Sequence, residues 1–278
     1  MRYQRVTSEQ DLLDGLRQPG TAILCGGTDV MVKMRSGVIQ PELLLDVSQL
    51  DTMREIRVED STLFIGAATT ESELMASPLI RQHVPLLSEV LAQLGSVQIR
   101  NKGTLGGNIV NASPAADGAI PLLLFDTMIQ LVGANSEQWI KLDDFFIGPG
   151  KTALAPGEFV RALKFPIPDP QCHSFFHKVG KRNALTIAIA SIGTLTCLED
   201  NVIRDMRIAV GSVAPTPKRL RDVEAGLIGK RLDHALIAAA SDAIVEAISP
   251  ISDVRASADY RKTVIGDLLI RALNSLLA

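Results

Sequence analysis

Short apolar runs bounded by glycine or charged residues dominate the first part of the chain, and they predict alternating strands and helices. Residues 21–25 form a compact apolar run that ends at a glycine pair, as a buried strand does. Residues 30–35 predict a helix capped by Thr28 or Asp29, and residues 43–47 predict a second buried strand. The order strand, loop, helix, strand suits nucleotide binding.

Three further elements follow before the pattern changes. Residues 63–67 predict another strand, and Thr70 with Glu73 forms a capping box that opens a helix. Pro85 begins a further helix, which Gly95 ends. This part of the chain therefore mixes strands and helices.

Residues 96–108 break the periodic pattern. They contain many glycines and asparagines but keep apolar anchors, which predicts an ordered loop and no regular element. A buried run at 120–125 and a predicted strand at 128–132 come next. Core segments therefore frame this loop on both sides in the sequence.

Pro166, Pro168 and Pro170 mark a predicted domain boundary, because proline lacks the backbone donor that a helix or a strand ladder needs. Beyond it, apolar runs predict the strands of a second sheet at 174–178, 186–198 and 203–213. Two helices close the chain, and the predicted buried face of the first consists of Ala235, Leu236, Ala239, Ala240, Ala243, Ile244 and Ala247. Strands followed by segregated helices indicate an α+β domain.

The composition is that of a folded protein. The 278 residues are 46% hydrophobic and 21% charged, and a chain of this length predicts two domains of moderate size. The net charge of −3 does not favour a nucleic acid partner. The longest uncharged window, 183–198, is too short and too interrupted for a membrane span, and the first residues lack the apolar run of a secretory leader. We therefore expect a cytoplasmic protein.

Cysteines and histidines are too scattered to predict a disulfide framework or a metal site. Cys25, Cys172 and Cys197 lie far apart, and three thiols are too few for an iron–sulfur cluster or a structural zinc site. Among the four histidines, His173 and His177 alone have the spacing at which a helix could bind a metal. That spacing is weak evidence, and we predict no metal in this chain.

Two glycine-rich segments are the strongest candidates for ligand binding. Gly26–Gly27 follow a predicted strand, and Gly106–Gly107 lie in the irregular stretch. Adjacent glycines allow backbone N–H groups to converge on phosphate oxygens, and Thr28 and Thr104 add hydroxyl groups. A tight turn is the alternative explanation for either pair alone. Together the two pairs favour binding of a pyrophosphate group.

No other segment predicts chemistry of its own. Residues 150–152 resemble the end of a P-loop, but Phe145 stands where that loop needs glycine, and no GxGxxG motif occurs.

Asp117 could accept a hydrogen bond from a ribityl hydroxyl or a ring N–H, or cap the next segment. Lys178 could contact a phosphate or a flavin, or belong to a solvated edge. We predict no catalytic side chain, since no nucleophile with its base is recognisable, and any chemistry belongs to a cofactor.

Several motifs taken together resemble one family. Residues 22–29, 98–109 and 111–114 are similar to the flavin loops of the FAD-binding subunit of molybdenum hydroxylases, the medium chain of xanthine and carbon monoxide dehydrogenases. Residues 148–152 and 255–261 resemble later parts of the same subunit, so the similarity extends over nearly the whole chain. The bacterial xanthine dehydrogenase branch looks most similar.

The resemblance implies an α+β protein of two domains. Residues 1–168 would form an FAD-binding domain of the vanillyl-alcohol oxidase type, with lobes of approximately 1–55 and 56–168. Residues 169–278 would form a C-terminal domain of sheet and helices, of the carbon monoxide dehydrogenase flavoprotein type.

The same resemblance implies where FAD binds. The first loop would wrap the pyrophosphate with Ile23, Leu24, Cys25, Gly26, Gly27, Thr28, Asp29 and Val30. A second wall would consist of Gly103, Thr104, Gly106, Gly107 and Asn108. Asp117 would contact the flavin end, and Val160 and Lys178 would approach the ring from the other side.

The implied function is electron transfer. A large partner would carry the molybdenum cofactor, a small partner the two-iron clusters, and this FAD would pass electrons to NAD or another acceptor. Xanthine, nicotinate or another heteroaromatic compound could be the substrate. Two alternatives remain: an assembly module that has lost flavin, which predicts damaged loops, and a self-contained flavin reductase, which needs a catalytic acid beside the ring.

Overall fold

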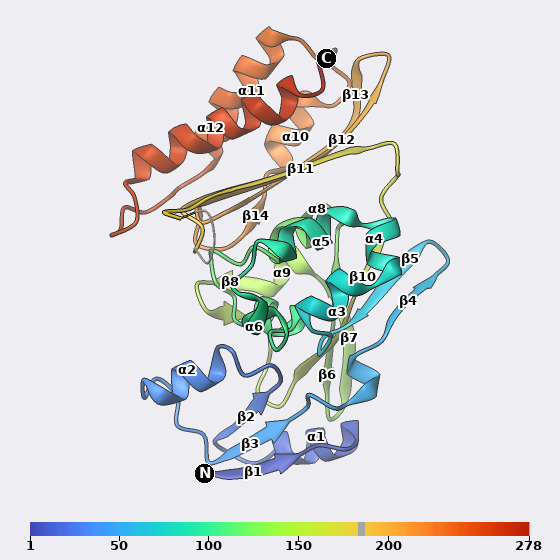
Figure 1. Ribbon diagram of the computed structural model, residues 1–278, viewed down its shortest axis with the longest axis vertical. Coiled ribbons are helices and arrows are strands. Elements are labelled where there is room, and N and C mark those ends of the chain that lie inside the picture. The colour runs from blue at the N-terminus through green and yellow to red at the C-terminus, as the bar shows by residue number, and fades with distance from the viewer. Residues whose placement is uncertain (183–186, 278) are drawn as a thin grey trace.

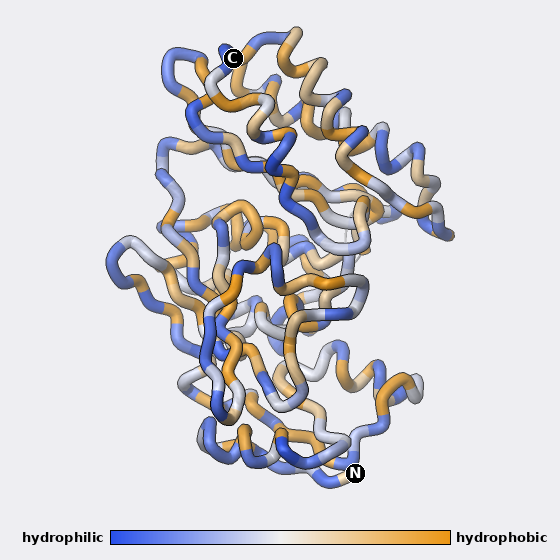
Figure 2. The backbone as a smooth tube through the Cα atoms, turned by 180° about the vertical axis from the view of Figure 1, so that it is seen from behind, coloured by the Kyte–Doolittle hydropathy of each residue, from blue (hydrophilic) through white to orange (hydrophobic). Residues whose placement is uncertain are grey.

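The computed structural model describes residues 1–182 and 187–277, which form stacked layers of sheet and helix (Figure 1). The two chain ends lie at opposite ends of the molecule (Figures 1 and 2). Mixed sheets and helices confirm the predicted α+β class. Among the described residues, none of the helices has the length and apolar character needed to span a bilayer.

The first layer is a small parallel sheet in the order β1-β3-β2. Its strands are β1 (Arg2–Arg5), β2 (Thr21–Leu24) and β3 (Leu43–Asp46), with helices α1 (Glu9–Leu16) and α2 (Val30–Arg35) between them. The central strand β3 is buried along its whole length, as an apolar strand of a parallel sheet should be. The carboxyl end of β2 therefore delivers the first glycine pair to the edge of this sheet.

The second layer is an antiparallel sheet in the order β4-β5-β10-β6-β7. These strands are β4 (Ile56–Glu59), β5 (Thr62–Gly66), β6 (Met128–Gly133), β7 (Ser136–Lys141) and β10 (Phe159–Pro166). Four helices and a small hairpin complete the layer: α3 (Glu71–Ala76), α4 (Pro78–His83), α5 (Pro85–Ala92), α9 (Leu142–Phe145), β8 (Phe146–Gly148) and β9 (Lys151–Thr152). The capping box predicted at Thr70 and Glu73 is confirmed at the start of α3.

The prediction of an irregular loop at 96–108 is wrong. Helices α6 (Val97–Arg100) and α7 (Leu105–Val110) occupy most of this stretch. The side chains of Ser96 and Thr104 cap them by accepting from the amides of Ile99 and Gly107. These caps and the burial of Leu105 outweigh the low helix propensity of the glycines.

The third layer is an antiparallel sheet in the order β11-β12-β13-β14 with helices on both faces. Its strands are β11 (His173–Val179), β12 (Ala190–Glu199), β13 (Val202–Gly211) and β14 (Lys218–Arg219). Helices α10 (Arg221–Leu227), α11 (His234–Ala247) and α12 (Ala258–Asn274) cover one face, and the buried helix α8 (Ala119–Leu124) packs against the other (Figure 1). The first residue of the predicted strand 186–198 lies outside the described residues.

The predicted face of helix α11 is partly wrong. Ala240 and Ile244 are buried as predicted, but Ala235, Ala239 and Ala243 are exposed, and the buried side includes Ile237, which the prediction left out. Hydrophobic and hydrophilic residues alternate along the C-terminal helices (Figure 2). Alanine is too small to fix which side of a helix is buried, so the isoleucines decide the orientation.

Two predictions about cysteine and histidine need correction. Cys172 and Cys197 form a disulfide, because the β11–β12 hairpin pairs His173 with Thr196 and so brings the two neighbouring cysteines together. Cys25 is a free thiol. His173 and His177 lie on a strand, where residues four apart are separated by about 13 Å, so their helical spacing has no meaning here.

Candidate functional site

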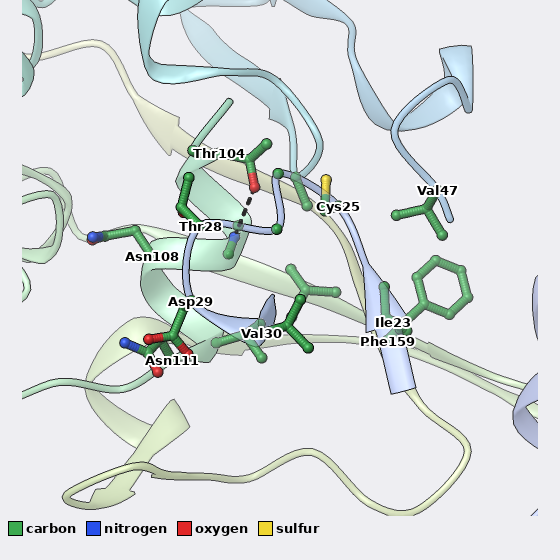
Figure 3. Close-up of a pocket in the computed structure, with 18 of the residues that line it drawn as sticks. Ile23, Cys25, Thr28, Asp29, Val30, Val47, Thr104, Asn108, Asn111 and Phe159 are labelled. Carbon is green, nitrogen blue, oxygen red and sulfur yellow. Dashed lines mark hydrogen bonds between the residues drawn. The ribbon is translucent and has the colours of Figure 1, made fainter. Parts of the chain in front are cut away.

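A cavity of about 500 Å³ lies between the loop that joins β2 to α2, helix α7 and the start of strand β10. In Figure 3 Ile23, Val47 and Phe159 gather on one side of it, whereas Asp29 and Asn111 lie on the other. The cavity therefore has an apolar wall and a polar wall. This division suits a ligand that combines aromatic and polar parts.

Most of the predicted site residues line this cavity. They are Ile23, Cys25, Gly26, Gly27, Thr28, Asp29, Val30, Gly103, Thr104, Gly106, Gly107, Asn108 and Val160. Leu24 lines an adjoining hollow that shares the first glycine loop. Asp117 and Lys178 line neither space.

The loop from Cys25 to Asp29 keeps backbone donors free for a ligand. In the part of the chain that the structure describes, the amides of Gly27, Thr28 and Asp29 donate to no protein acceptor. Gly27 has a φ of +74°, a left-handed conformation that glycine adopts without strain. A Cβ on Gly26 would lie 1.9 Å from the carbonyl oxygen of Lys102, so only glycine fits between these two segments. Three adjacent amides can therefore converge on an anion.

The second glycine pair does not form the predicted nest of amides. Gly106 and Gly107 lie in α7, and their N–H groups already donate to Ala67 O at 3.0 Å and to Thr104 Oγ1 at 3.1 Å. A Cβ on Gly106 would lie 2.5 Å from the Ala67 carbonyl oxygen, so this glycine permits close packing. Because neither glycine has a side chain, the pair leaves the cavity wall open for close approach of a ligand.

Lys33, which the sequence analysis did not single out, brings a positive charge to the cavity wall. Its ammonium group lies 2.7 Å from Asp29 Oδ2 and donates to Asn111 Oδ1 at 2.7 Å. The Lys33 side chain is 40% exposed, so this ion pair is screened by water and contributes little to stability. It can still attract a phosphate group.

Three buried side-chain oxygens near the cavity have no hydrogen-bond partner in residues 1–182 and 187–277: Glu71 Oε2, Asn108 Oδ1 and Asp117 Oδ1. Burial raises the pKa of Glu71 to about 7, Arg100 lowers it and Asp117 raises it further. Buried polar atoms nearly always have partners in native proteins. A ligand that supplies hydrogen bonds at this end of the cavity would satisfy them.

Asp117 and Lys178 form an ion pair with each other. Lys178 Nζ lies 2.7 Å from Asp117 Oδ2 and also donates to Gln93 O at 2.7 Å. The two side chains are only 5% and 7% exposed. Burial raises the pKa of Asp117, and the ammonium of Lys178 opposes that effect. The pair joins the third layer to the second, which neither the solvated-edge nor the helix-cap explanation anticipated.

The sequence analysis missed several residues that line the cavity. They are Lys33, Ile39, Val47, Met53, Ala67, Glu71, Ile99, Val110, Leu154, Glu158 and Phe159. Most are apolar residues that look like ordinary core positions in a sequence. The exceptions are Lys33, Glu71 and Glu158. Glu71 follows the capping residue Thr70 directly, and a carboxylate there is usually explained as favourable at a helix start.

Two family models together match nearly the whole chain. Residues 1–168 match the FAD binding domain in molybdopterin dehydrogenase, and residues 175–276 match the CO dehydrogenase flavoprotein C-terminal domain.

Curated relatives are similar over most of their length. The glyceraldehyde dehydrogenase medium chain of Sulfolobus acidocaldarius is 31% identical over 271 residues, 97% of this chain and 96% of the relative. The carbon monoxide dehydrogenase medium chain of Hydrogenophaga pseudoflava is 32% identical, covering 91% of this chain and 88% of the relative. The xanthine dehydrogenase FAD-binding subunit of Escherichia coli O157:H7 is 29% identical, covering 99% and 96%.

The solved structures agree with the sequence comparisons. Carbon monoxide dehydrogenase from Hydrogenophaga pseudoflava superimposes with a TM-score of 0.95 at 30% identity, over 99% of this chain and 96% of that chain. The fold, the domain matches and the relatives lead to the same assignment. This chain belongs to the molybdopterin dehydrogenase FAD-binding family and is an FAD-binding flavoprotein subunit of the molybdenum hydroxylase type, an oxidoreductase component.

Proposed function

We propose that the cavity beside the first glycine loop holds FAD and that the chain transfers electrons within a molybdenum hydroxylase complex. The observation that carries this proposal is the loop itself, where the amides of Gly27, Thr28 and Asp29 have no protein acceptor among the described residues. A pyrophosphate needs several converging donors of this kind.

The other residues of the cavity also fit FAD. Val47 and Phe159 offer apolar surface to an aromatic ring. Asn108 Oδ1 is a buried acceptor that no described residue satisfies, and it suits a ribityl hydroxyl or a ring N–H. Both glycine segments are intact, which argues against the alternative of an assembly module that has lost flavin.

Bound FAD would supply the redox chemistry, since it can exchange electrons singly or in pairs. The residues of this chain would bind and orient it. The loop from Cys25 to Val30 and the wall formed by Gly103, Thr104, Gly106, Gly107 and Asn108 would hold the pyrophosphate, while Leu24 supports the loop from the adjoining hollow. Val160 would pack against the ring. The Asp117–Lys178 pair would orient the flavin end from behind the cavity wall.

Electrons would reach this chain from partner subunits. We propose a small partner with two-iron clusters and a large partner with the molybdenum cofactor, as the family resemblance implies. This chain cannot supply the thiolates of a cluster, because two of its three cysteines are joined in a disulfide. NAD is one candidate for the final acceptor, and the cytoplasm is the proposed location.

The substrate of the complex stays open in this proposal. Relatives of comparable similarity are named for different substrates, among them carbon monoxide, xanthine and nicotinate. Xanthine and purine breakdown therefore have no special support from this chain. The substrate would bind the large partner, so its identity has to be sought there.

The test is the absorbance spectrum of the gently purified protein, with the released flavin identified after denaturation. We expect a flavin spectrum and FAD at about one per chain. A colourless protein that cannot be reconstituted with FAD, alone or with its partners, would contradict the proposal and favour the flavin-free assembly module.

A further inference from the structure

Glu71 places a carboxyl group in the wall of the cavity. It is the first residue of α3, and its backbone N–H donates to Gly103 O at 2.9 Å. A Cβ on Gly103 would lie 3.2 Å from both carboxylate oxygens of Glu71, so the carboxyl group lies against the Gly103 backbone. Glu71 is only 2% exposed. The protein thus excludes bulk water from this group.

No hydrogen bond or ion pair within the described residues offsets the cost of burying the Glu71 carboxyl group. Its Oε2 atom has no hydrogen-bond partner in the described part of the chain. Arg100 on α6 acts on it through its charge, but the Arg100 guanidinium donates to Leu94 O and Gly95 O, at 2.9 and 3.2 Å. Burying a carboxyl group without a partner is costly, so such a position usually serves a ligand.

Burial favours the neutral form of Glu71, and the two charges that act on it oppose each other: Arg100 lowers its pKa, whereas Asp117 raises it by a smaller amount. Asp117 faces it with a like charge, which the Lys178 ammonium partly balances. The other helices packed against α3 contribute little, because their titratable side chains are at least partly exposed: Arg81 and His83 on α4 and Glu89 on α5. A neutral carboxyl group carries one O–H donor. That donor needs an acceptor, and Glu71 Oε2 has no hydrogen-bond partner within the described residues.

We propose that Glu71 binds FAD directly, by donating a hydrogen bond from its protonated carboxyl group to a carbonyl oxygen or ring nitrogen of the flavin. This inference rests on the proposed function, because it requires FAD in the cavity. It adds a proton-linked contact to that function: FAD binds most tightly when Glu71 is neutral.

The pH dependence follows from linkage. Burial raises the pKa of Glu71 to about 7, and a bond donated by the neutral form raises it further when FAD is bound. FAD binding therefore takes up a proton at pH values near and above that pKa. The affinity is highest below the pKa of the free protein and falls as the pH rises through it, by at most about tenfold per pH unit.

The experiment titrates the full-length apoprotein with FAD between about pH 6 and pH 8.5, using flavin fluorescence. We expect the wild-type dissociation constant to rise by about tenfold across this range. Glu71→Gln keeps an N–H donor of similar shape, so it should bind FAD at all these pH values nearly as well as wild type at the low end. Glu71→Ala should bind about tenfold more weakly and without the pH dependence. Circular dichroism at each pH checks that the variants are folded.

Glu89→Gln is the matched control, because Glu89 is an exposed carboxylate on α5 outside the cavity. It should titrate like wild type. Calorimetry in buffers of different ionisation enthalpy gives a second readout: wild type and Glu89→Gln should take up protons on binding FAD near pH 7.5, whereas Glu71→Gln should not.

Two results would overturn the inference while leaving the proposed function intact. The first is an unchanged pH dependence in Glu71→Gln. The second is tighter wild-type binding at high pH with proton release, which would mean that ionised Glu71 accepts a bond instead. Failure of wild type to bind FAD at any pH would overturn the proposed function as well, so the two failures are distinguishable.

Discussion

Gly107 lies where α7 meets the cavity, and its lack of a side chain keeps that surface open. Among the described residues, the protein atom that an added Cβ would meet is Thr104 Oγ1, at 2.9 Å. If FAD occupies the cavity as proposed, we expect Gly107→Val to place methyl groups in its space and to weaken binding by about tenfold to a hundredfold, or about 1–3 kcal/mol. FAD titration of the apoprotein measures this loss.

Gly226 provides the control for that substitution. It is also helical, in α10, and an added Cβ would meet no atom within 4 Å. Gly226→Val should therefore leave FAD affinity unchanged. If Gly107→Val retained FAD at wild-type affinity, α7 would not be part of the site.

The role of a single residue could be predicted from the sequence where its type allows few roles. Gly27 has a left-handed backbone, which glycine adopts without strain, so its place in a turn could be foreseen from the residue type. Glu71 and Lys33 could not be foreseen as cavity residues, since carboxylates and lysines are common on surfaces and burial depends on distant segments. Lys178 was recognised as a candidate, but its pairing with Asp117 depends on contact between two layers.

At the scale of elements, helix caps explain the main failure of the sequence analysis. Val30–Arg35 was predicted as α2 with its observed bounds, but the predicted cap does not form, since the side chain of the N-cap residue Asp29 makes no capping hydrogen bond. The helices α6 and α7 were missed because the glycines in this stretch were taken to indicate a loop, although Ser96 and Thr104 are capping residues. Caps are local, so a search for them could have found both helices.

The cap of α7 carries a testable consequence, because Thr104 also lines the cavity. Thr104 accepts from the Gly107 amide, and we expect Thr104→Ala to lower the free energy of unfolding by about 0.5–2 kcal/mol. It should also weaken FAD binding, since α7 would lose its fixed start beside the proposed FAD site. Thr104→Ser, which keeps the hydroxyl group, should restore both. Urea unfolding and FAD titration are the measurements.

Ser257 offers a matched comparison, as it caps α12 in the same way by accepting from Tyr260 N at 3.2 Å. Ser257→Ala should cost similar stability but leave the FAD dissociation constant unchanged. Equal effects of the two substitutions on FAD binding would mean that the effect of Thr104 is one of general stability.

At the scale of the whole molecule, long-range pairing was beyond the sequence pattern. The disulfide between Cys172 and Cys197 depends on the register of β11 and β12, which apolar runs do not specify. The order of the layers likewise depends on α8, whose apolar side chains fill the space between two sheets. A run that is apolar on all sides predicts burial, but it does not say between which partners.

A buried ion-pair network joins the C-terminal layer to the rest of the molecule, and Arg219 is its centre. Its guanidinium donates to Glu224 Oε1 at 2.6 Å within its own layer and to Asp126 Oδ1 at 2.7 Å in the segment after α8. Arg219 and Glu224 are both buried, with side chains 5% and 6% exposed. Removing one partner of a buried pair leaves an uncompensated charge, which costs far more than the pair contributes.

We therefore expect Arg219→Met to lower the free energy of unfolding by about 3–5 kcal/mol. The double variant Arg219→Met with Glu224→Gln should recover much of this loss, because it removes the unpaired carboxylate. Arg204→Met is the control: its pair with Glu199 is exposed, at 66% and 61%, and should contribute no more than about 1 kcal/mol. Urea unfolding followed by circular dichroism measures all three variants. A loss in Arg219→Met no larger than that in the control would show that the network does not hold the layers together.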